Sequence, residues 1–321
     1  MKGTARIWLI AAAALICIGI LVFCCALAVV HGDIAALGNN DYQTHTWETG
    51  EAFRSISILS DTEDIALLPS EDEKCRVVFY EREKEKHSAA VEQGTLSIEK
   101  TDAGSWLDHI EFFSVGTAKI TIYLPQAEYD SLFIEEDTGD IVLSKDLTFD
   151  SVDISTDTGN IDCYASSARR MRMESDTGDI RMENLSAGEI DLAVDTGRVE
   201  IRSVGCRGDL AVSAGAGETL LSGVSCNNLS SGGSTGHIIL ENVIAAAMIT
   251  LTRDTGDVRL EQCDAAELLI ETATGDVSGS LLSDKVFITQ SDTGSITVPE
   301  SISGGKCKIT TDTGDISIVI P

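Results

Sequence analysis

Acidic residues recur at two fixed positions around a repeated glycine, and this placement is the feature of the sequence that could carry chemistry. The tetrapeptide Asp-Thr-Gly-Asp or a close variant returns every 19 or 20 residues. Two residues before the glycine lie Asp137, Asp157, Asp176, Asp254 and Asp312, and directly after it lie Asp140, Asp179, Asp257 and Asp315. Carboxylate oxygens are the ligands that a hard cation such as Ca²⁺ prefers. These residues are therefore a candidate metal site in the form of a cation ladder.

Stacking of the repeats would bring carboxylates of one column close together. At a strand spacing of roughly 4.8 Å two such charges repel by about 1 kcal/mol in water, and by several-fold more at a lower effective dielectric. Bound Ca²⁺ could offset that repulsion. The alternative is that each Asp is solvated and hydrogen-bonded to its own turn, and the sequence leaves both explanations open. The acidic pattern is interrupted between Arg198 and His237, which makes this region a candidate contact surface.

The residues that flank each glycine alternate between apolar and polar with period two, which is typical of β-strands. Pairs such as Ile180 and Met182 follow the glycine, and pairs such as Leu132 and Ile134 precede it. A unit of about 20 residues is too short for a propeller blade, which needs about 40. It has the length of one coil of a parallel β-solenoid, in which each coil pairs with the coils above and below.

We therefore predict an all-β fold, a single-stranded parallel β-solenoid of about ten coils of 19–20 residues, formed by residues 137–321. A right-handed β-helix is expected because parallel crossovers have that hand. Residues 51–136 do not follow the repeat and are predicted to form an irregular N-terminal β region that caps the solenoid. Most aromatic residues lie before residue 150 and are expected to fill the core of this cap, the alternative being a sugar-binding platform.

The N-terminal segment predicts a membrane anchor. Residues 7–30 contain no charged side chain, and about twenty such residues suffice for a helix to cross the hydrocarbon core. Lys2 and Arg6 precede this transmembrane helix, so residues 1–6 are expected in the cytoplasm. Residues 31–50 then form a tether, and the C-terminal domain is extracytoplasmic on a single-pass protein of the cell membrane. A cleaved signal peptide is the alternative, although signal sequences have shorter apolar regions of about 7–15 residues.

Charge and composition exclude several functions. A net charge of −29 repels phosphate backbones, which argues against a nucleic-acid partner. A catalytic site should be a local exception to the repeat, and no such exception, nucleophile elbow, phosphate loop or metalloprotease motif is found. We therefore predict that the chain is not an enzyme, and Ca²⁺ is the sole candidate cofactor.

Two cysteines are a candidate disulfide. Cys206 and Cys226 each lie nine residues after the glycine of their repeat, in neighbouring coils. Stacking of those coils would bring their Cα atoms within disulfide range.

Several segments carry a resemblance to a known family. The stretch KITIYLP at 119–125, the stretch SLFIEEDTGDIVL at 131–143 and the tandem DTGDI repeats resemble the bacterial putative-adhesin β-strand repeat family. The resemblance implies a β-solenoid domain of unknown molecular function that is associated with the cell envelope. It supplies no catalytic residues, because a glycine-turn repeat defines stacking rather than chemistry.

The expected function is a membrane-anchored, extracytoplasmic β-solenoid that binds or senses at the cell surface without catalysis. Alternatives are a cation-dependent glycan-binding adhesin and a carbohydrate-active β-helix enzyme. The expected partners are the membrane, through the N-terminal helix, and an envelope protein or cell-surface molecule. Self-association is expected through the C-terminal coil, Gly314 to Pro321, because nothing in the sequence caps its last strand.

Overall fold

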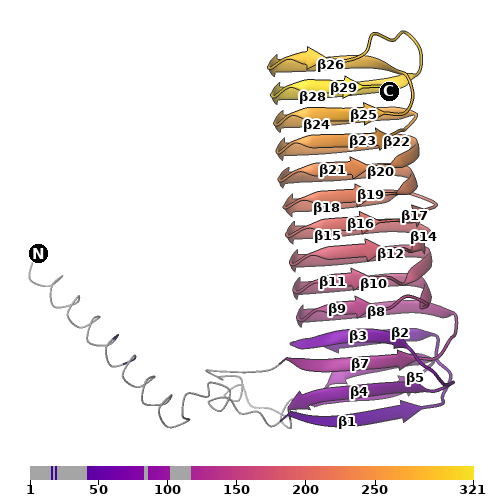
Figure 1. Cartoon of the computed structure of the whole chain (residues 1–321). Coiled ribbons are helices and arrows are strands. Elements are labelled where there is room, and N and C mark those ends of the chain that lie inside the picture. Colours follow the sequence, from indigo (N-terminus) through magenta and orange to yellow (C-terminus); the bar gives the residue numbers. More distant parts are fainter. Residues whose placement is uncertain (1–15, 17–18, 20–41, 83–85, 102–116) are drawn as a thin grey trace, which may run out of the picture.

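The computed structural model describes residues 16, 19, 42–82, 86–101 and 117–321 (Figure 1). The predicted membrane helix at 7–30 lies outside these residues apart from two isolated positions. Within the described part of the chain, no helix has the length and apolar character needed to cross a membrane. Residues 42–49, expected to belong to a tether, instead form a strand that pairs with residues 75–82.

The described strands form two sheets that run the length of a rod (Figure 1). The 14-stranded sheet has the order β1 (Tyr42–Thr49), β4 (Cys75–Arg82), β7 (Ala118–Leu124), β3 (Glu63–Pro69), β9 (Ile141–Leu143), β11 (Ile161–Cys163), β13 (Ile180–Glu183), β16 (Val199–Arg202), β19 (Thr219–Ser222), β21 (Ile238–Glu241), β23 (Val258–Cys263), β25 (Val277–Leu281), β29 (Ile316–Val319), β27 (Ile296–Thr297).

The 15-stranded sheet has the order β26 (Lys285–Thr293), β28 (Gly305–Thr313), β24 (Glu267–Thr274), β22 (Ile244–Thr255), β20 (Ser225–Thr235), β18 (Leu210–Ala216), β15 (Glu189–Thr196), β12 (Ser166–Thr177), β10 (Thr148–Thr158), β8 (Tyr129–Thr138), β2 (Ser55–Ser60), β6 (Thr95–Lys100), β5 (His87–Glu92), with β14 (Ser186–Ala187) and β17 (Gly205–Cys206) beside it.

Each regular coil contributes one strand to each of the two sheets, and the Asp-Thr-Gly turn connects these two strands. The pairing is parallel, with residues of equal position in the repeat side by side: Ile154 pairs with Ile134 on one side and Met173 on the other. Inward residues of both sheets form one continuous apolar core. The predicted all-β solenoid is confirmed, and the predicted number of coils is approximately right.

A second corner of the coil is built from residues in the left-handed backbone region. Asn184, Ser203, Gly223, Asn242 and Gln262 have φ between 53° and 64°, and each lies six residues after its turn glycine. A buried apolar residue follows each of them and points into the core, as Leu185 and Val204 do. Left-handed φ values are unfavourable for most side chains, so this corner is a defined turn and not a loose loop.

The N-terminal cap has antiparallel strands, whereas the stack itself begins earlier than predicted. β4 pairs antiparallel with β7 and with β1, and β5 pairs antiparallel with β6. By contrast β2 and β3 pair in parallel with β8 and β9, as one more coil of the stack. The expected boundary between residues 136 and 137 falls inside β8 and is not a structural boundary.

The last coil of the chain is not the last coil of the rod. β28 lies between β24 and β26, and β29 lies between β25 and β27. The chain therefore forms the outermost coil with residues 285–297 and then returns to fill the gap beneath it with residues 305–319 (Figure 1). The expectation that the C-terminal coil offers a free edge is wrong, because both of its strands have neighbours on both sides within the chain.

Candidate functional site

The turn glycine is required by the close approach of successive coils. Gly159 has φ +156°, and a Cβ placed on it would lie 1.9 Å from the carbonyl oxygen of Gly139 in the coil below. Gly178 meets Gly159 in the same way. Only glycine permits this contact, because any side chain would overlap backbone atoms that cannot move independently.

The position directly after the glycine carries a hydrogen-bond ladder. Four aspartates at this position each accept, through Oδ1, the backbone N–H of the equivalent residue in the next coil, at 2.7–2.9 Å between N and O. The pairs are Asp140 with Asn160, Asp179 with Arg198, Asp257 with Asp276 and Asp276 with Asp315. Asp315 accepts both N–H and Oγ–H of Ser295, and these bonds lower the pKa of its carboxyl. The ladder supplies acceptors for N–H groups at a turn.

His237 stands in this ladder as a substitute acceptor. Its Nδ1 atom accepts the backbone N–H of Asp257 at 3.0 Å, as an aspartate oxygen does elsewhere. Arg198 instead donates its backbone N–H to Asp179, and its guanidinium pairs with Glu218 at 3.1 Å. Between residues 198 and 237, side chains other than aspartate therefore make the contacts between neighbouring coils. Sequence reasoning alone did not detect this.

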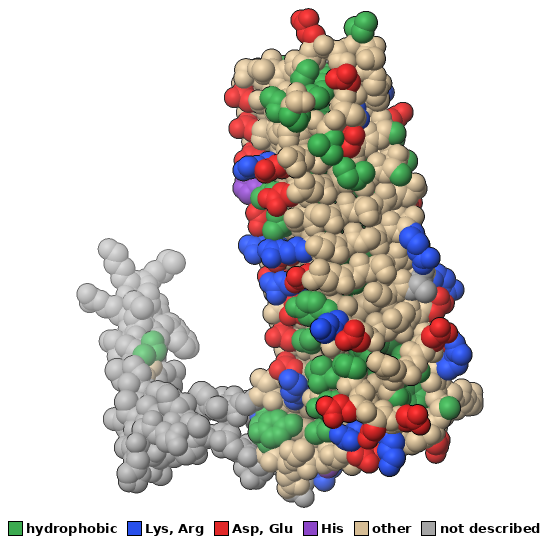
Figure 2. Space-filling view, turned by 45° about the vertical axis from the view of Figure 1, so that its right-hand side comes forward, with side chains coloured by type: hydrophobic (Ala, Val, Ile, Leu, Met, Phe, Trp, Pro, Cys, Tyr) green, Lys and Arg blue, Asp and Glu red, His purple; other side chains and the backbone are tan. Residues whose placement is uncertain are grey.

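The position two residues before the glycine is different. Asp137, Asp157, Asp176, Asp254 and Asp312 are all exposed. Figure 2 shows acidic side chains along one edge of the rod, with basic side chains and a histidine among them. Among the described residues, no three His, Cys, Asp or Glu side chains are grouped closely enough to hold a metal ion. Binding of Ca²⁺ to this column stays a prediction, and equal thermal midpoints with Ca²⁺ and with chelator would contradict it.

The predicted disulfide partners stack on one another as buried thiols. Gly205 pairs with Ser225, which places Cys206 and Cys226 at equivalent positions of neighbouring coils. Both are free in the structure. Burial raises the pKa of both thiols, that of Cys226 to about 12, so neither is a reactive thiolate. The disulfide stays a prediction that the mass of the intact, non-reduced chain can test.

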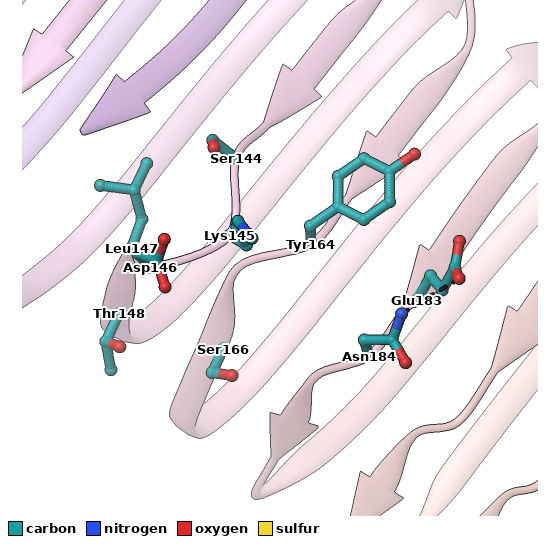
Figure 3. A pocket seen from close by; sticks show the side chains of 9 residues that line it. All are labelled: Ser144, Lys145, Asp146, Leu147, Thr148, Tyr164, Ser166, Glu183 and Asn184. Carbon is teal, nitrogen blue, oxygen red and sulfur yellow. Dashed lines mark hydrogen bonds between the residues drawn. The ribbon is translucent and has the colours of Figure 1, made fainter.

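A hollow of about 530 Å³ opens at the second corner, in the lower part of the rod. It is lined by Ser144, Lys145, Asp146, Leu147, Thr148, Tyr164, Ser166, Glu183 and Asn184 (Figure 3). We call this hollow the corner notch. Its volume falls in the range of about 300–1,000 Å³ that is usual for small-molecule sites.

The notch results from coils of unequal corner length. The inward apolar residue lies eight residues after the glycine in the coil of Leu147, six in the coil of Ala165 and seven in the coil of Leu185. The short corner between a long one and a regular one leaves the stack incompletely filled. Spacing of the apolar residues could have revealed this departure from the repeat.

The notch combines an aromatic ring with groups that bind hydroxyls. Tyr164 lies between Ser144 and Lys145 on one side and Glu183 and Asn184 on the other (Figure 3). The amide Nδ2 of Asn184 donates to Glu183 Oε1 at 3.0 Å, which orients that carboxylate. An aromatic face beside carboxylate, amide and ammonium groups suits a small polar ligand that also has an apolar face.

A second hollow, of about 760 Å³, lies at the same corner near the far end of the rod. Small residues line much of it, including Ala245, Ala246 and Gly305. At its base the buried Lys285 ammonium donates to Asp264 Oδ1 and Ser283 Oγ, both at 2.6 Å. These bonds engage the Lys285 ammonium at the base of the second hollow, and backbone and small side chains form much of the remaining lining.

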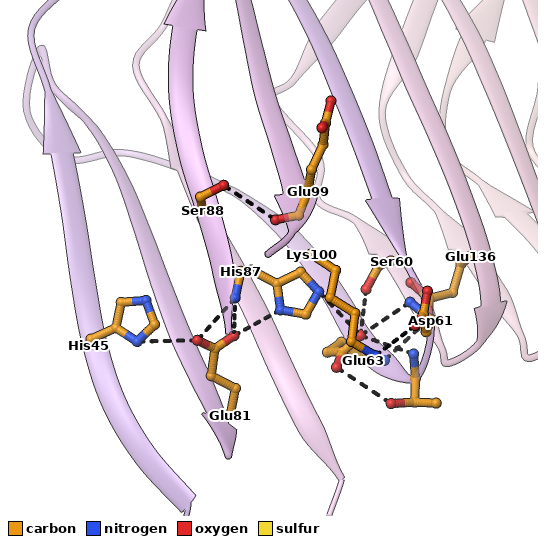
Figure 4. A network of polar contacts seen from close by, with 11 residues as sticks. His45, Ser60, Asp61, Glu63, Glu81, His87, Ser88, Glu99, Lys100 and Glu136 are labelled. Carbon is orange, nitrogen blue, oxygen red and sulfur yellow. Dashed lines mark hydrogen bonds and ion pairs between the residues drawn. The ribbon is translucent and has the colours of Figure 1, made fainter. Parts of the chain in front are cut away.

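The N-terminal cap contains a largely buried network of titratable side chains (Figure 4). Glu81 accepts from His87 Nδ1 at 2.8 Å and lies 3.4 Å from His45 Nδ1. On its other side, His87 Nε2 lies 3.6 Å from Glu63 Oε2. The side chain of His87 is fully buried, so this His–Glu pair cannot reach a substrate in solvent. The network fastens β1, β4 and β5 to the first coil.

Glu136 extends the network into the stack. Its Oε1 accepts the backbone N–H of Glu63 at 3.2 Å, while its Oε2 is buried without a hydrogen-bond partner. Burial, with a smaller contribution from the charge of Glu63, raises the pKa of Glu136 to about 8. Glu136 is therefore protonated at neutral pH. Sequence reasoning missed this network, because it lies outside the periodic part of the chain.

The geometry defines a class of protein: a two-sheet parallel β-solenoid with a glycine-turn ladder. The family model described as "Toastrack DUF4097" matches residues 53–218 and 207–321. The chain therefore belongs to the Toastrack DUF4097 family, in agreement with the resemblance to adhesin-like β-strand repeats.

Comparison with solved structures gives matches at low sequence identity. One is described as a "putative adhesin" from Parabacteroides distasonis (TM-score 0.50, 12% identity, covering 87% of this chain and 98% of that one). Others are a "putative lipid binding protein" from the same organism (0.49, 13%, 88% and 98%) and a "putative adhesin" from Bacteroides fragilis (0.41, 14%, 86% and 97%). None of the curated proteins compared with the chain matches it.

Proposed function

We propose that the chain is a membrane-anchored, extracytoplasmic protein of the cell envelope that binds a partner and performs no catalysis. Membership of the Toastrack family and the adhesin-like solved structures support a binding role. The anchor is the apolar stretch 7–30, followed by a right-handed solenoid outside the cell. The observation that carries the proposal is the corner notch, where polar and aromatic side chains gather at a break in an otherwise regular rod.

The orientation is tested with reporters fused to the C-terminus of the full chain. A reporter that is active only outside the cytoplasm is expected to be active, and one that is active only in the cytoplasm is expected to be silent. The opposite pattern would overturn the predicted topology.

A neutral glycan is the ligand class that the notch favours. Tyr164 offers a ring face to the C–H side of a sugar, and the carboxylates of Asp146 and Glu183 can accept from sugar hydroxyls. The net charge of −29 favours neutral over acidic saccharides. No cation is needed, because the notch itself contains the hydroxyl-binding groups. This retains the glycan-binding adhesin as a second function and removes its dependence on Ca²⁺.

The glycan proposal is tested with the full chain in detergent micelles against neutral and acidic hexose and N-acetylhexosamine oligosaccharides. Tyr164→Ala is expected to weaken binding about 10-fold, equivalent to about 1.4 kcal/mol. Tyr164→Phe should retain most of the affinity, because the ring remains. Phe133→Ala is the control, since Phe133 is an exposed ring outside the notch. Absence of saccharide binding, or equal binding by Tyr164→Ala, would refute the assignment of the notch.

A further inference from the structure

The outermost coil exposes core positions that are buried elsewhere in the rod. Ile296, two residues after its turn glycine, is 43% exposed, whereas the equivalent Ile316 in the coil beneath is 1% exposed. Phe287 is likewise only partly buried above the fully buried Cys307. The apolar core of the described rod is therefore only partly covered at this end, where Val298 packs against it and the connection from β27 to β28 rises past the outermost coil (Figure 1). Figure 2 shows apolar side chains gathered near this end.

The same coil presents two strand edges. Within the described residues, β26 pairs with β28 alone and β27 pairs with β29 alone, so each has one open side. Between Lys285 and Asp292 the edge strand has no charge and no proline, and Val286 and Ile288 are 37% and 50% exposed. Natural proteins usually protect such edges with charges, prolines or bulges. An edge without these devices is suited to pairing with another strand.

A molecule that binds this end must pair with both strand edges and cover the core between them. An extended peptide could pair with one sheet only, whereas another coil could pair with both. A second copy of this chain carries such a coil at the same end. The rotation that matches them is a two-fold axis perpendicular to both sheets, because it makes β26 and β27 antiparallel to their partners and keeps inward residues inward.

Size and charge agree with a second copy. A strand of nine residues spans about 30 Å, and two sheets about 10 Å apart are about 20 Å thick with their outward side chains, so the end face is at most about 600 Å² per copy. The pair would bury at most about 1,200 Å² in total, which reaches the lower limit of stable interfaces. Contact between the sides of two rods would oppose their acidic columns, whereas residues 286–291 of the end strand are uncharged.

We propose that two copies of the chain associate end to end through β26 and β27. This association goes beyond the binding role of the notch. The sheets of one rod continue into the other, and the N-terminal caps lie at the two far ends of a rod of doubled length. With the predicted anchors in place, the pair joins two facing membranes and does not form within one membrane.

Sedimentation of the full chain in density-matched detergent tests the proposal. The wild type is expected to pass from one copy to two as its concentration rises. Ile288→Lys should raise the dissociation constant at least 10-fold, because it places a charge at the centre of the joined edge. Ile244→Lys is the matched control: it is 40% exposed on β22, away from the end, and should not change association. Thermal midpoints of both variants check that they fold, and Val286→Lys replaces Ile288→Lys if that variant does not.

Electron micrographs of the associated protein should show rods of doubled length. A single copy at all concentrations would overturn the proposal, as would a dimer that Ile288→Lys and Val286→Lys leave unchanged. Side-by-side pairs or continuous fibres would also overturn it, because they require a different contact. If the chain never dimerises but binds an extended peptide, the occupant of this end is a peptide and the proposal of a second copy is wrong.

Discussion

The Glu136→Gln variant should be more stable than the wild type, and this gain in stability should be larger at alkaline pH than at acidic pH. The carboxyl ionises at its ordinary pKa of 4.5 in the unfolded chain, but at about 8 in the folded protein. The unfolded state therefore gains a free-energy advantage that grows between pH 4.5 and 8 and is constant above pH 8. Glu136→Gln removes this advantage, because glutamine has no charge to desolvate.

The size of the effect follows from the difference between the two pKa values. Each unit corresponds to about 1.36 kcal/mol, so 3.5 units give at most about 5 kcal/mol in total and about 4 kcal/mol between pH 5 and pH 8.5. Relaxation of the cap at high pH reduces this maximum, and we expect a gain of at least about 2 kcal/mol.

Guanidinium unfolding of the full chain in micelles, followed by circular dichroism at pH 5 and pH 8.5, measures the effect. Glu135→Gln is the control, because Glu135 is the exposed neighbour of Glu136 on the same strand. The stability difference between Glu136→Gln and wild type should widen with pH, and that for Glu135→Gln should not. If the two variants respond equally to pH, the burial argument is wrong.

Two further pairs of substitutions test the stacking itself. Gly159→Ala should cost several kcal/mol or prevent folding, because its Cβ would overlap the Gly139 carbonyl, whereas Gly205→Ala, whose nearest neighbour atom is 3.9 Å away, should cost less than about 1 kcal/mol. Denaturant midpoints compare them, and similar losses would contradict the close-approach argument. Asp257→Ala should cost about 1 kcal/mol, since it leaves the Asp276 N–H without an acceptor, while the exposed Asp254→Ala should cost close to nothing. Equal effects of the two aspartates would show that the ladder bond contributes no stability.

The periodic part of the fold could be predicted from the sequence because one physical requirement is repeated in every coil. Each turn needs a glycine and each inward position needs an apolar residue, so residues such as Ile180 and Met182 report their own environment. The pattern could also have located the corner notch, since the number of residues between the glycine and the inward apolar residue of the second corner changes at Leu147 and Ala165.

Other features depend on contacts that no local pattern records. Residues 305–319 satisfy the repeat as well as any coil, and nothing in them indicates that they lie beneath residues 285–297. The network around Glu81 and His87 joins strands that are distant in the sequence and occur once. The role of the aspartates after the glycine could not be predicted without the position of the next coil, because their partner is a backbone N–H that lies 19 or 20 residues away, or 39 residues away for Asp276.

The position of the last coil bears on how the rod is completed during synthesis. Earlier coils can stack in the order in which they leave the ribosome, each on the one before. Residues 285–297 emerge before the residues that separate them from β24 and β25, so their final neighbour does not yet exist. Until residues 305–319 are available, residues 285–297 either remain unpaired or pair with β24 and later move outward by one coil. The outermost coil therefore reaches its final position only after residues 305–319 have been made.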